Sequence, residues 1–396
     1  MELSDRKNPY SPRVSATSLI PACYPHVREQ FQNELQKTFR RLGVDENSPL
    51  VRRAVAENID AYTRVVPKSV SKGDVLEIWQ RFIQDKIDIV KIKALEYAPT
   101  VARFFKKDDL GERMFKFIKE VDPDRKAWRI RYALAECIAS LLPYLEKELI
   151  KKDSVEIFEE LLKDSETEVK TITLLKVPEL AQKLSQQQSF SIFFEYIEKG
   201  SKDTSINVRM AVVEILAAYL ATVDREKVKE NGIGLIMNMV KDDNQNIRIG
   251  LVQRIKDLVE VVGEEGTTQY LLPMIENCLV DKKWRFKVAV AESLHDLFKT
   301  LKYEQHKEFF NKIVKAFMKD HFCAVREQTI SSIMSLKGVL GVEAEMEIVS
   351  ELVKLLVNDA NYVYRVTGLQ LMFRAHNVLD KNDFNEVFIT TCTHSI

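Results

Sequence analysis

Glycine and proline are scarce in this chain, with 12 and 11 copies among its 396 residues. Hairpin-rich sheets and glycine-rich nucleotide-binding loops depend on these residues for tight turns and left-handed backbone positions. Their scarcity therefore argues against a β-sandwich, a barrel and a phosphate-binding loop. No glycine lies between Gly111 and Gly200, and no proline follows Pro273. Long stretches of helix are the structure that this composition favours.

Paired cysteines, an excess of one charge and long apolar runs are also lacking. The five cysteines form no CxxC pair, which is typical of a reducing compartment; we expect the cytoplasm, with the nucleus left open. The 59 basic residues balance the 59 acidic ones, so no overall positive field favours nucleic acid as a partner. No apolar run is long enough to span a membrane, and the N-terminus lacks the apolar core of a signal peptide. We therefore expect no membrane insertion.

Candidate catalytic and metal-binding residues are scattered. The six histidines never fall at a metal-ligand spacing, and His321 and Cys323 are only two residues apart. Two such residues point to different faces of a helix or lie in a turn. No GxxxxGK[ST], GxGxxG or GxSxG motif occurs. We therefore predict that the protein is not an enzyme and has no catalytic residue, metal site or cofactor.

What the chain does have is an internal repeat of about 39 residues. Each unit carries an Asp, a few further residues, and then an Arg or Lys that opens an apolar stripe with helical spacing. A second amphipathic stretch precedes each Asp, so a unit is two helices joined by an Asp-containing turn. The nine phased basic residues are Arg52, Lys91, Arg129, Lys170, Arg209, Arg248, Arg285, Arg326 and Arg365.

This period is typical of two-helix repeats of the HEAT or armadillo class. A two-helix unit cannot bury its apolar face alone, so neighbouring units stack. The sequence therefore predicts an all-α fold, an α-solenoid of about nine full HEAT repeats. We expect a polar lead-in over residues 1–14 and a single solenoid over residues 15–396. A partial repeat at each end, over 15–27 and 383–391, indicates an internal segment of a longer solenoid.

The turns that precede the second helices should line up along one edge, which we call the turn ridge. We expect each turn Asp to cap the helix that follows it. The phased basic residues should tie each turn to the Asp of its neighbour. The expected exceptions are Arg52 with Arg53 and the basic residues beside the tryptophans.

Two tryptophans lie on this turn ridge, and each precedes an arginine. Trp128 and Trp284 are 156 residues, or four repeats, apart. A Trp followed by Arg at the start of a helix is an anchor for a protein partner. The alternative is that each Trp fills the joint between adjacent turns. Trp79 lies in the middle of a helix, and we expect it in the core.

The order and phase of the turn sequences resemble the HEAT-repeat scaffold (A) subunit of protein phosphatase 2A over nearly the whole chain. KAWRIRYALAE, LLPMIENCLVDKKWRFKVAVAE, DHFCAVREQTI and DANYVYRVTGL carry this resemblance. It implies a non-catalytic scaffold that holds a serine/threonine phosphatase catalytic subunit and an exchangeable regulatory B-type subunit. Cys323 departs from the pattern, because a larger aromatic residue is expected there.

The resemblance also implies binding residues for both partners. Those implied for the catalytic subunit are Lys283, Trp284, Arg285, His321, Phe322, Tyr362 and Arg365. Those implied for the regulatory subunit are Pro49, Arg52, Arg53, Trp128 and Arg129. The alternative function is an importin-type HEAT transport adaptor. Zero net charge disfavours it, because such adaptors tend to be acidic to receive basic cargo.

Overall fold

The computed structural model describes residues 2–44, 48–105, 110–277, 279, 283–301, 303–336, 338–376 and 385. All regular structure in these ranges is helical. The α-helices are α1 (Tyr10–Cys23), α2 (Glu29–Gly43), α3 (Pro49–Glu57), α4 (Ile59–Val65), α5 (Lys68–Val70), α6 (Leu76–Ile83), α7 (Asp88–Ala102), α9 (Lys116–Lys119), α10 (Trp128–Leu141), α11 (Lys147–Leu149), α12 (Val155–Leu162), α13 (Thr167–Ala181), α14 (Gln186–Ser201), α15 (Ile206–Leu220), α16 (Arg225–Lys227), α17 (Ile233–Val240), α18 (Gln245–Gln253), α19 (Ile255–Gly266), α20 (Leu272–Asn277), α21 (Trp284–Thr300), α22 (Tyr303–Met318), α23 (Cys323–Met334), α24 (Val342–Val357) and α25 (Tyr362–His376). Two 3-10 turns, η1 (Glu2–Ser4) and η2 (Tyr24–His26), and five π-helical turns, η3 (Ser71–Val75), η4 (Gly111–Phe115), η5 (Ile150–Ser154), η6 (Val228–Gly232) and η7 (Thr267–Leu271), complete the order.

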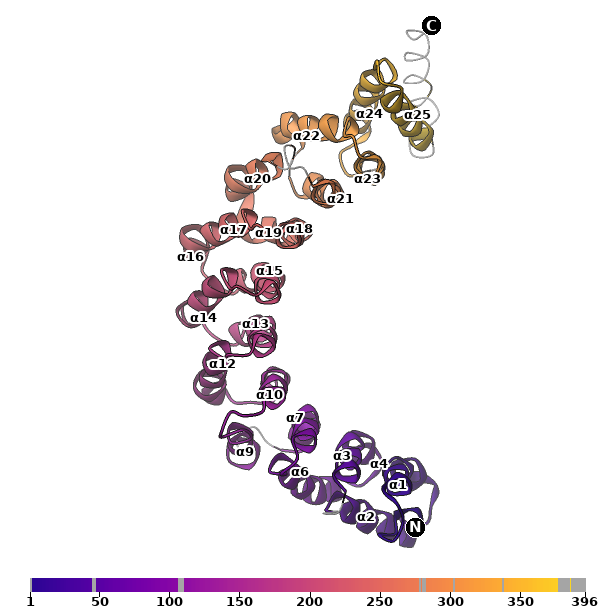
Figure 1. The fold of residues 1–396 in the computed structure, drawn as a ribbon, viewed down its shortest axis with the longest axis vertical. Coiled ribbons are helices and arrows are strands. Elements are labelled where there is room, and N and C mark those ends of the chain that lie inside the picture. Colours follow the sequence, from indigo (N-terminus) through magenta and orange to yellow (C-terminus); the bar gives the residue numbers. More distant parts are fainter. Residues whose placement is uncertain are drawn as a thin grey trace. The chain divides into compact units, whose positions relative to one another are not determined.

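The chain divides into two compact units, Met1–Tyr196 and Ile197–Ile396, and the single solenoid domain expected over residues 15–396 stays a prediction. In each unit the helices alternate between two layers. In the first unit, α6, α9 and α12 form one layer and α7, α10 and α13 the other (Figure 1). In the second unit, α17, α20 and α22 lie opposite α18, α21 and α23 (Figure 1). This stack of helical pairs confirms the predicted all-α solenoid.

In each pair, the second helix begins three residues before a basic residue. Arg52 follows the start of α3 at Pro49 in this way, and Arg365 follows the start of α25 at Tyr362. In this register the series is Arg52, Lys91, Arg131, Lys170, Arg209, Arg248, Lys287, Arg326 and Arg365, with a spacing of 39 residues at every step except one of 40. The expected series was therefore wrong at two positions, where Arg131 and Lys287 replace Arg129 and Arg285.

The turn aspartates do not cap the helices as we expected. The residue before the helix donates its backbone N–H to an Asp two residues earlier, for example Ile87 to Asp85 and Phe322 to Asp320, both at 2.9 Å. The Asp lies too far back to reach the amides of the first helical turn. It therefore fixes the approach of the chain to the helix, as in an Asx-turn. Asn244 does cap its helix, because its side chain accepts a hydrogen bond from the N–H of Asn246 at 2.8 Å.

The two ends of the chain differ from the expected boundaries. Helix α1 begins at Tyr10, inside the predicted polar lead-in, and Ser4 is buried. The Arg41 side chain donates hydrogen bonds to the backbone oxygen and the hydroxyl of Ser4 at 2.8 and 2.9 Å, so this segment packs on α2. The partial repeat predicted over 383–391 lies outside the described residues, apart from 385.

The core of each pair comes from the apolar stripes that define the repeat. In α10, Ile130, Leu134 and Ile138 are buried at helical spacing, and this helix packs against α7 and α13. Trp79 is fully buried and donates its indole N–H to the carbonyl oxygen of Ala94 at 2.8 Å. The prediction that Trp79 lies in the core is confirmed.

Candidate protein-binding surface

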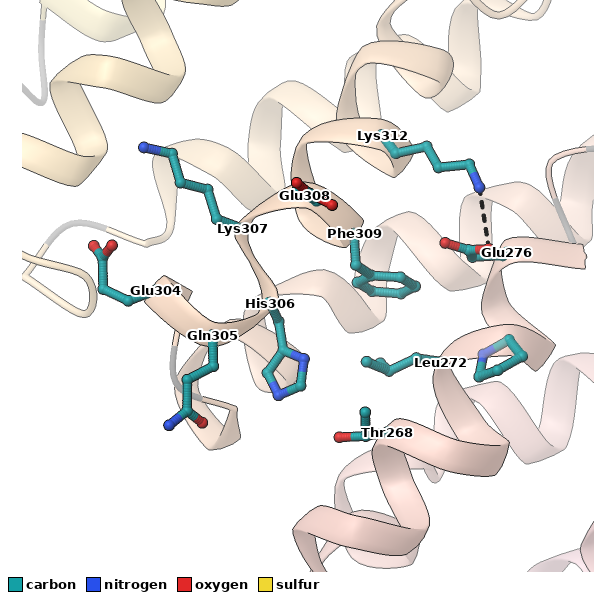
Figure 2. A pocket seen from close by; sticks show the side chains of 11 residues that line it. Thr268, Leu272, Glu276, Glu304, Gln305, His306, Lys307, Glu308, Phe309 and Lys312 are labelled. Atoms are coloured by element: carbon teal, nitrogen blue, oxygen red, sulfur yellow. Dashed lines mark hydrogen bonds and ion pairs between the residues drawn. The ribbon is translucent and has the colours of Figure 1, made fainter.

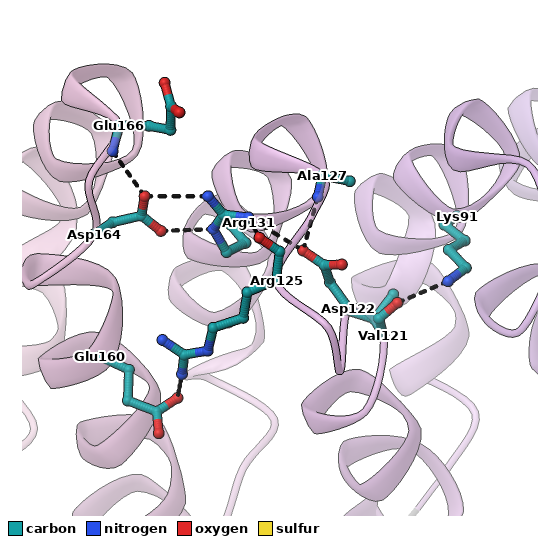
Figure 3. A network of polar contacts seen from close by, with 9 residues as sticks. All are labelled: Lys91, Val121, Asp122, Arg125, Ala127, Arg131, Glu160, Asp164 and Glu166. Carbon is teal, nitrogen blue, oxygen red and sulfur yellow. Dashed lines mark hydrogen bonds and ion pairs between the residues drawn. The ribbon is translucent and has the colours of Figure 1, made fainter.

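A network of ion pairs ties neighbouring turns together beneath the turn ridge (Figure 3). Its centre is Arg131, whose Nε and Nη2 donate to the two carboxylate oxygens of Asp164 in the next turn at 2.6 and 3.2 Å. Its third nitrogen, Nη1, donates to the carbonyl oxygen of Arg125 at 2.6 Å and to Asp122 at 3.3 Å. These contacts hold Arg125 in a left-handed conformation, with φ of 52°. Arg131 and Asp164 are almost completely buried, so the pair works as a structural link between two repeats.

The same link recurs at every second repeat. Arg52 bonds to Asp85 at 2.6 Å, Arg209 to Asp242 at 2.7 Å, and Lys287 to Asp320 at 2.9 Å. At two of the intervening positions the phased residues bind uncharged oxygens. Lys91 donates to the carbonyl of Val121 at 2.8 Å, and Arg326 donates to the hydroxyl of Thr367 at 2.9 Å. The predicted tie to the Asp of the neighbouring turn is confirmed at Arg209 and occurs also at Arg52, an expected exception, whereas at Lys91 and Arg326 the partner is not an Asp.

The charge of Asp164 depends on this link. Burial by itself would raise the pKa of the carboxyl, because it penalises the charged form. The hydrogen bonds from Arg131 and from the N–H of Glu166 outweigh burial, so the pKa of Asp164 lies below its usual range. Arg131 responds in the opposite direction, and its pKa is raised chiefly by the hydrogen bond to Asp164.

The residues expected to contact a regulatory subunit at the first repeat are mostly engaged within the protein. Arg52 was expected to be an exception to the structural series, but its guanidinium is bound to Asp85 with only 13% of the side chain exposed. Arg53 forms an ion pair with Glu57 on the same helix at 2.8 Å. Pro49 is half-buried and occupies the first helical position, which its fixed φ suits. Partner binding by these three residues stays a prediction.

The two tryptophans occupy equivalent positions, and both carry a stacked arginine. The guanidinium carbon of Arg129 lies 4.6 Å from the ring centre of Trp128, and that of Arg285 lies 4.8 Å from the ring centre of Trp284. Both arginines are exposed, and both tryptophans are half-buried. The expectation that the basic residues beside the tryptophans leave the structural series is confirmed, because Arg131 and Lys287 take their place.

In the second unit the structure brings two predicted residues into contact. The rings of Trp284 and Phe322 stack with their centres 6.0 Å apart and their planes at 26°. Trp284 thus touches the adjacent turn, as the joint-filling alternative required, and Phe322 remains 46% exposed. Lys283, Arg285 and His321 are exposed around these rings. We call Lys283, Trp284, Arg285, His321 and Phe322 together the Trp284 surface.

The next turn extends this exposed surface. Tyr362, at the start of α25, is 69% exposed. Arg365 is exposed and donates to the carbonyl oxygens of Asp359 and Ala360, each at 2.9 Å. Sequence reasoning missed the apolar residues that follow on the same face of α25, at positions three and four residues apart. These residues are Val366, Leu369 and Phe373.

A pocket of about 590 Å³ lies between η7–α20 and α22. Figure 2 shows the His306 ring pointing toward Thr268 and Leu272. Glu276 and Lys312 at its edge form an ion pair at 3.1 Å. The described residues contain no group of three or more His, Cys, Asp or Glu side chains that could hold a metal ion. Within those same ranges, no helix has the length and apolarity needed to cross a bilayer.

Comparison with solved structures shows a HEAT-type solenoid fold. The karyopherin Kap121p is 15% identical, with a TM-score of 0.64 over 98% of this chain and 42% of that one. Its structure bound to Nup53p is 14% identical, with a TM-score of 0.65 and the same coverage. The Kap95:Nup1 complex is 11% identical, with a TM-score of 0.67 over 95% of this chain and 51% of that one. The chain thus spans about half of these proteins or less, and at such identities the likeness concerns the fold.

A family model gives a more particular match. The model described as the middle domain of PIK3R4-like proteins matches residues 222–394, less than half of the chain and entirely within the second unit. No curated protein matches the sequence. The match covers the Trp284 surface but not Trp128.

Proposed function

We propose that the protein is a non-catalytic, protein-binding solenoid that holds a partner along its turn ridge. The observation that carries this proposal is the Trp284 surface. Arg285 lies outside the network of ion pairs that links the repeats, since Lys287 takes the structural position in this turn. Large aromatic side chains and arginines are the residues that most often dominate the energy of a protein interface.

The comparisons bear on the class of partner. Kap121p is a karyopherin, and its solved structures include complexes with Nup53p and with the SUMO protease Ulp1p. This likeness favours an importin-type adaptor over a phosphatase scaffold as the function of the chain. The match of residues 222–394 supports a second candidate, in which the second unit serves as the middle domain of a PIK3R4-like protein. Either function places the protein in the cytoplasm, and the importin-type function adds the nucleus.

The phosphatase 2A catalytic subunit and a B-type subunit remain partners implied by the turn sequences alone. Neither comparison supports them. Their proposed contacts are the catalytic-subunit set, from Lys283 to Arg365, and the regulatory-subunit set, from Pro49 to Arg129.

A photo-cross-linking amino acid placed at Phe322 tests the general proposal in cells. Phe31 on α2 is a matched control position, because it is a phenylalanine of similar exposure (53% against 46%) in the other unit. We expect a discrete cross-linked protein from position 322 that is absent from position 31 and is lost when Trp284→Ala is added. Absence of any cross-link at 322, at normal expression of the chain, contradicts protein binding by this surface.

Binding measurements with purified candidate ligands then distinguish the proposed functions. Each of two ligands, a basic nuclear-localisation peptide and the phosphatase catalytic subunit, is titrated against the wild type and Trp284→Ala. Binding of the peptide supports the importin-type function. Binding of the catalytic subunit that is weakened by Trp284→Ala restores the phosphatase scaffold. Failure of both leaves the PIK3R4-like domain as the proposal to pursue with the cross-linked protein.

A further inference from the structure

The Trp284 surface combines partly exposed aromatic rings with an arginine, Arg285, that is not neutralised by a carboxylate of the described residues. No carboxylate of the described residues forms an ion pair with Arg285, whose recorded contact is the ring of Trp284. Arg209 of the same unit differs, since it is paired with Asp242. An exposed arginine that is held in place but lacks a carboxylate suits an anionic ligand.

Stacking leaves the guanidinium ready to bind such a ligand. One face of Arg285 is covered by the Trp284 ring, while its N–H donors lie in the plane of the guanidinium and point away from that face. These donors match the two oxygens of a carboxylate. Because the ring restricts the side chain before binding, less conformational entropy is lost when the ligand arrives.

The backbone around these side chains is also electropositive. Asp and Glu are usually favoured in the first turn of a helix, where they neutralise the positive end of the helix dipole. The first turns of α21, α23 and α25 contain no acidic residue. Arg285, His321 and Arg365 are exposed at or beside these three helix starts. The charge on this row of turns is therefore complementary to an acidic partner.

The rings set a second requirement on the partner. Trp284 and Phe322 form a stacked platform that spans two adjacent turns. Neighbouring helices lie about 8–10 Å apart, and an extended peptide advances about 3.3 Å per residue, so about three residues cross this platform. A peptide with apolar side chains between its acidic residues can place the former on the rings and the latter beside Arg285.

We propose that the Trp284 surface binds an acidic segment of a partner protein whose carboxylates alternate with apolar side chains. This inference rests on the proposed protein-binding function and names the chemistry of its ligand. Trp128 and Arg129 repeat the stacked pair in the first unit. No aromatic ring is recorded in stacking contact with Trp128 within the described residues, so we expect weaker binding at that site.

The test uses the full chain labelled with 5-fluorotryptophan and observed by fluorine NMR. Its three tryptophans give three signals, which Trp→Phe variants assign, and the buried Trp79 is an internal control. The probes are a ten-residue peptide in which Glu alternates with Leu, and two matched peptides with Lys or Gln in place of Glu. We expect the Glu peptide to shift the Trp284 signal, to shift Trp128 less and to leave Trp79 unchanged.

Variants that each remove one arginine charge test which residue binds the Glu peptide. Arg285→Gln should weaken binding of the Glu peptide at Trp284 by about tenfold. Arg129→Gln changes the equivalent residue of the first unit, and Arg225→Gln removes the same charge from the exposed start of α16. Both should leave the Trp284 response unchanged. The affinity at Trp284 should also fall as salt is raised, because exposed charges are screened.

The other outcomes separate this inference from the proposed function. If the Lys or Gln peptide shifts Trp284 as strongly as the Glu peptide, the acidic specificity is wrong and protein binding stands. The acidic specificity is also wrong if no peptide shifts Trp284 while the cross-link at position 322 is observed. If both the peptides and the cross-link fail, the proposed function falls as well.

Discussion

Helices α10 and α21 both begin with the dipeptide Trp-Arg, at Trp128 and Trp284, but the surfaces around these two helix starts differ. Each places a Trp at the first helical position, stacks the following Arg on it, and uses a basic residue three positions after the Trp to bind the next turn. Arg131 makes a buried, two-pronged contact with Asp164, whereas Lys287 makes a single bond to Asp320. Trp284 meets Phe322, the residue before α23, whereas the equivalent residue before α13 is Glu166.

This difference shows that the neighbouring turn decides what an anchor residue can do. The Trp128 turn is the more strongly tied to its neighbour, and the Trp284 turn offers the larger aromatic platform. Four predictions follow the comparison, from the largest expected effect to the smallest.

The largest effect is expected from Arg131→Ala. It leaves Asp164 and Asp122 buried beside no cation, which should lower the free energy of unfolding by about 3–5 kcal/mol. Lys287→Ala removes one bond from a more exposed pair and should cost about 1–3 kcal/mol. Urea denaturation gives the size of each loss, and hydrogen exchange in α10 and α13 or in α21 and α23 locates it.

Arg129→Ala and Arg285→Ala are the controls, since each removes a cation two residues away that does not link the repeats. Both should change stability by less than about 0.5 kcal/mol. Equal losses from Arg131→Ala and Lys287→Ala would show that the two turns are tied with the same strength.

Acid should weaken the first unit through the same pair. Burial opposes ionisation of Asp164, but the bonds from Arg131 and the Glu166 amide outweigh it, so its folded pKa lies below the unfolded value of about 3.9. The stabilisation is therefore complete above that value and is lost as the pH falls through the folded pKa. Unfolding of the wild type and Arg131→Met between pH 6 and pH 3 should show a stability difference that narrows below about pH 4. A constant difference across that range would exclude Asp164 as the source.

A double-mutant cycle measures the contact that distinguishes the Trp284 turn. Trp284→Ala and Phe322→Ala should be coupled by about 0.5–1.5 kcal/mol, because their rings stack. The matched cycle of Trp128→Ala with Glu166→Ala, the residue equivalent to Phe322, should show coupling near zero. Similar coupling in both cycles would mean that the aromatic contact adds nothing to the joint between turns.

The smallest effect concerns the charge above each indole ring. Iodide should quench the fluorescence of Trp284 in Trp128→Phe and of Trp128 in Trp284→Phe, while the buried Trp79 stays protected in both. Adding Arg285→Gln or Arg129→Gln should lower the respective quenching constant on the order of twofold, because the cation that attracts iodide is gone. Acrylamide, which is uncharged, should show no such decrease.

The repeat could be predicted from the sequence because helical periodicity and the turn Asp are local signals. The position of the basic residue that binds the next repeat could not be predicted at two of the nine turns. In KAWRIRYAL and KKWRFKVAV, basic residues stand at both the second and the fourth helical positions, and the pattern alone does not say which one faces the next repeat. The second position lies beside the Trp ring, and the fourth lies over the neighbouring Asp, which only the packed helices reveal.

The candidate surface was predicted in part for the same reason. Exposed Trp, Arg and Phe residues were found from their place in the repeat, but Arg52, which shares the phase of the structural residues, was taken for a contact residue although it is bound to Asp85. The apolar face of α25 carries apolar residues at i, i+3 and i+7, a spacing that is also typical of buried helix faces, so its exposure could not be predicted from the pattern.

The sequence by itself determined that this protein is a stack of helical pairs, because a 39-residue period of amphipathic segments can bury its apolar faces only by stacking. It also determined that an Asp-containing turn precedes the second helix of each pair. The tertiary structure decided which of two nearby cations links the repeats and which aromatic residues meet. Those outcomes depend on side chains about 30 to 40 residues apart in the sequence, and only the distance between packed helices brings them together.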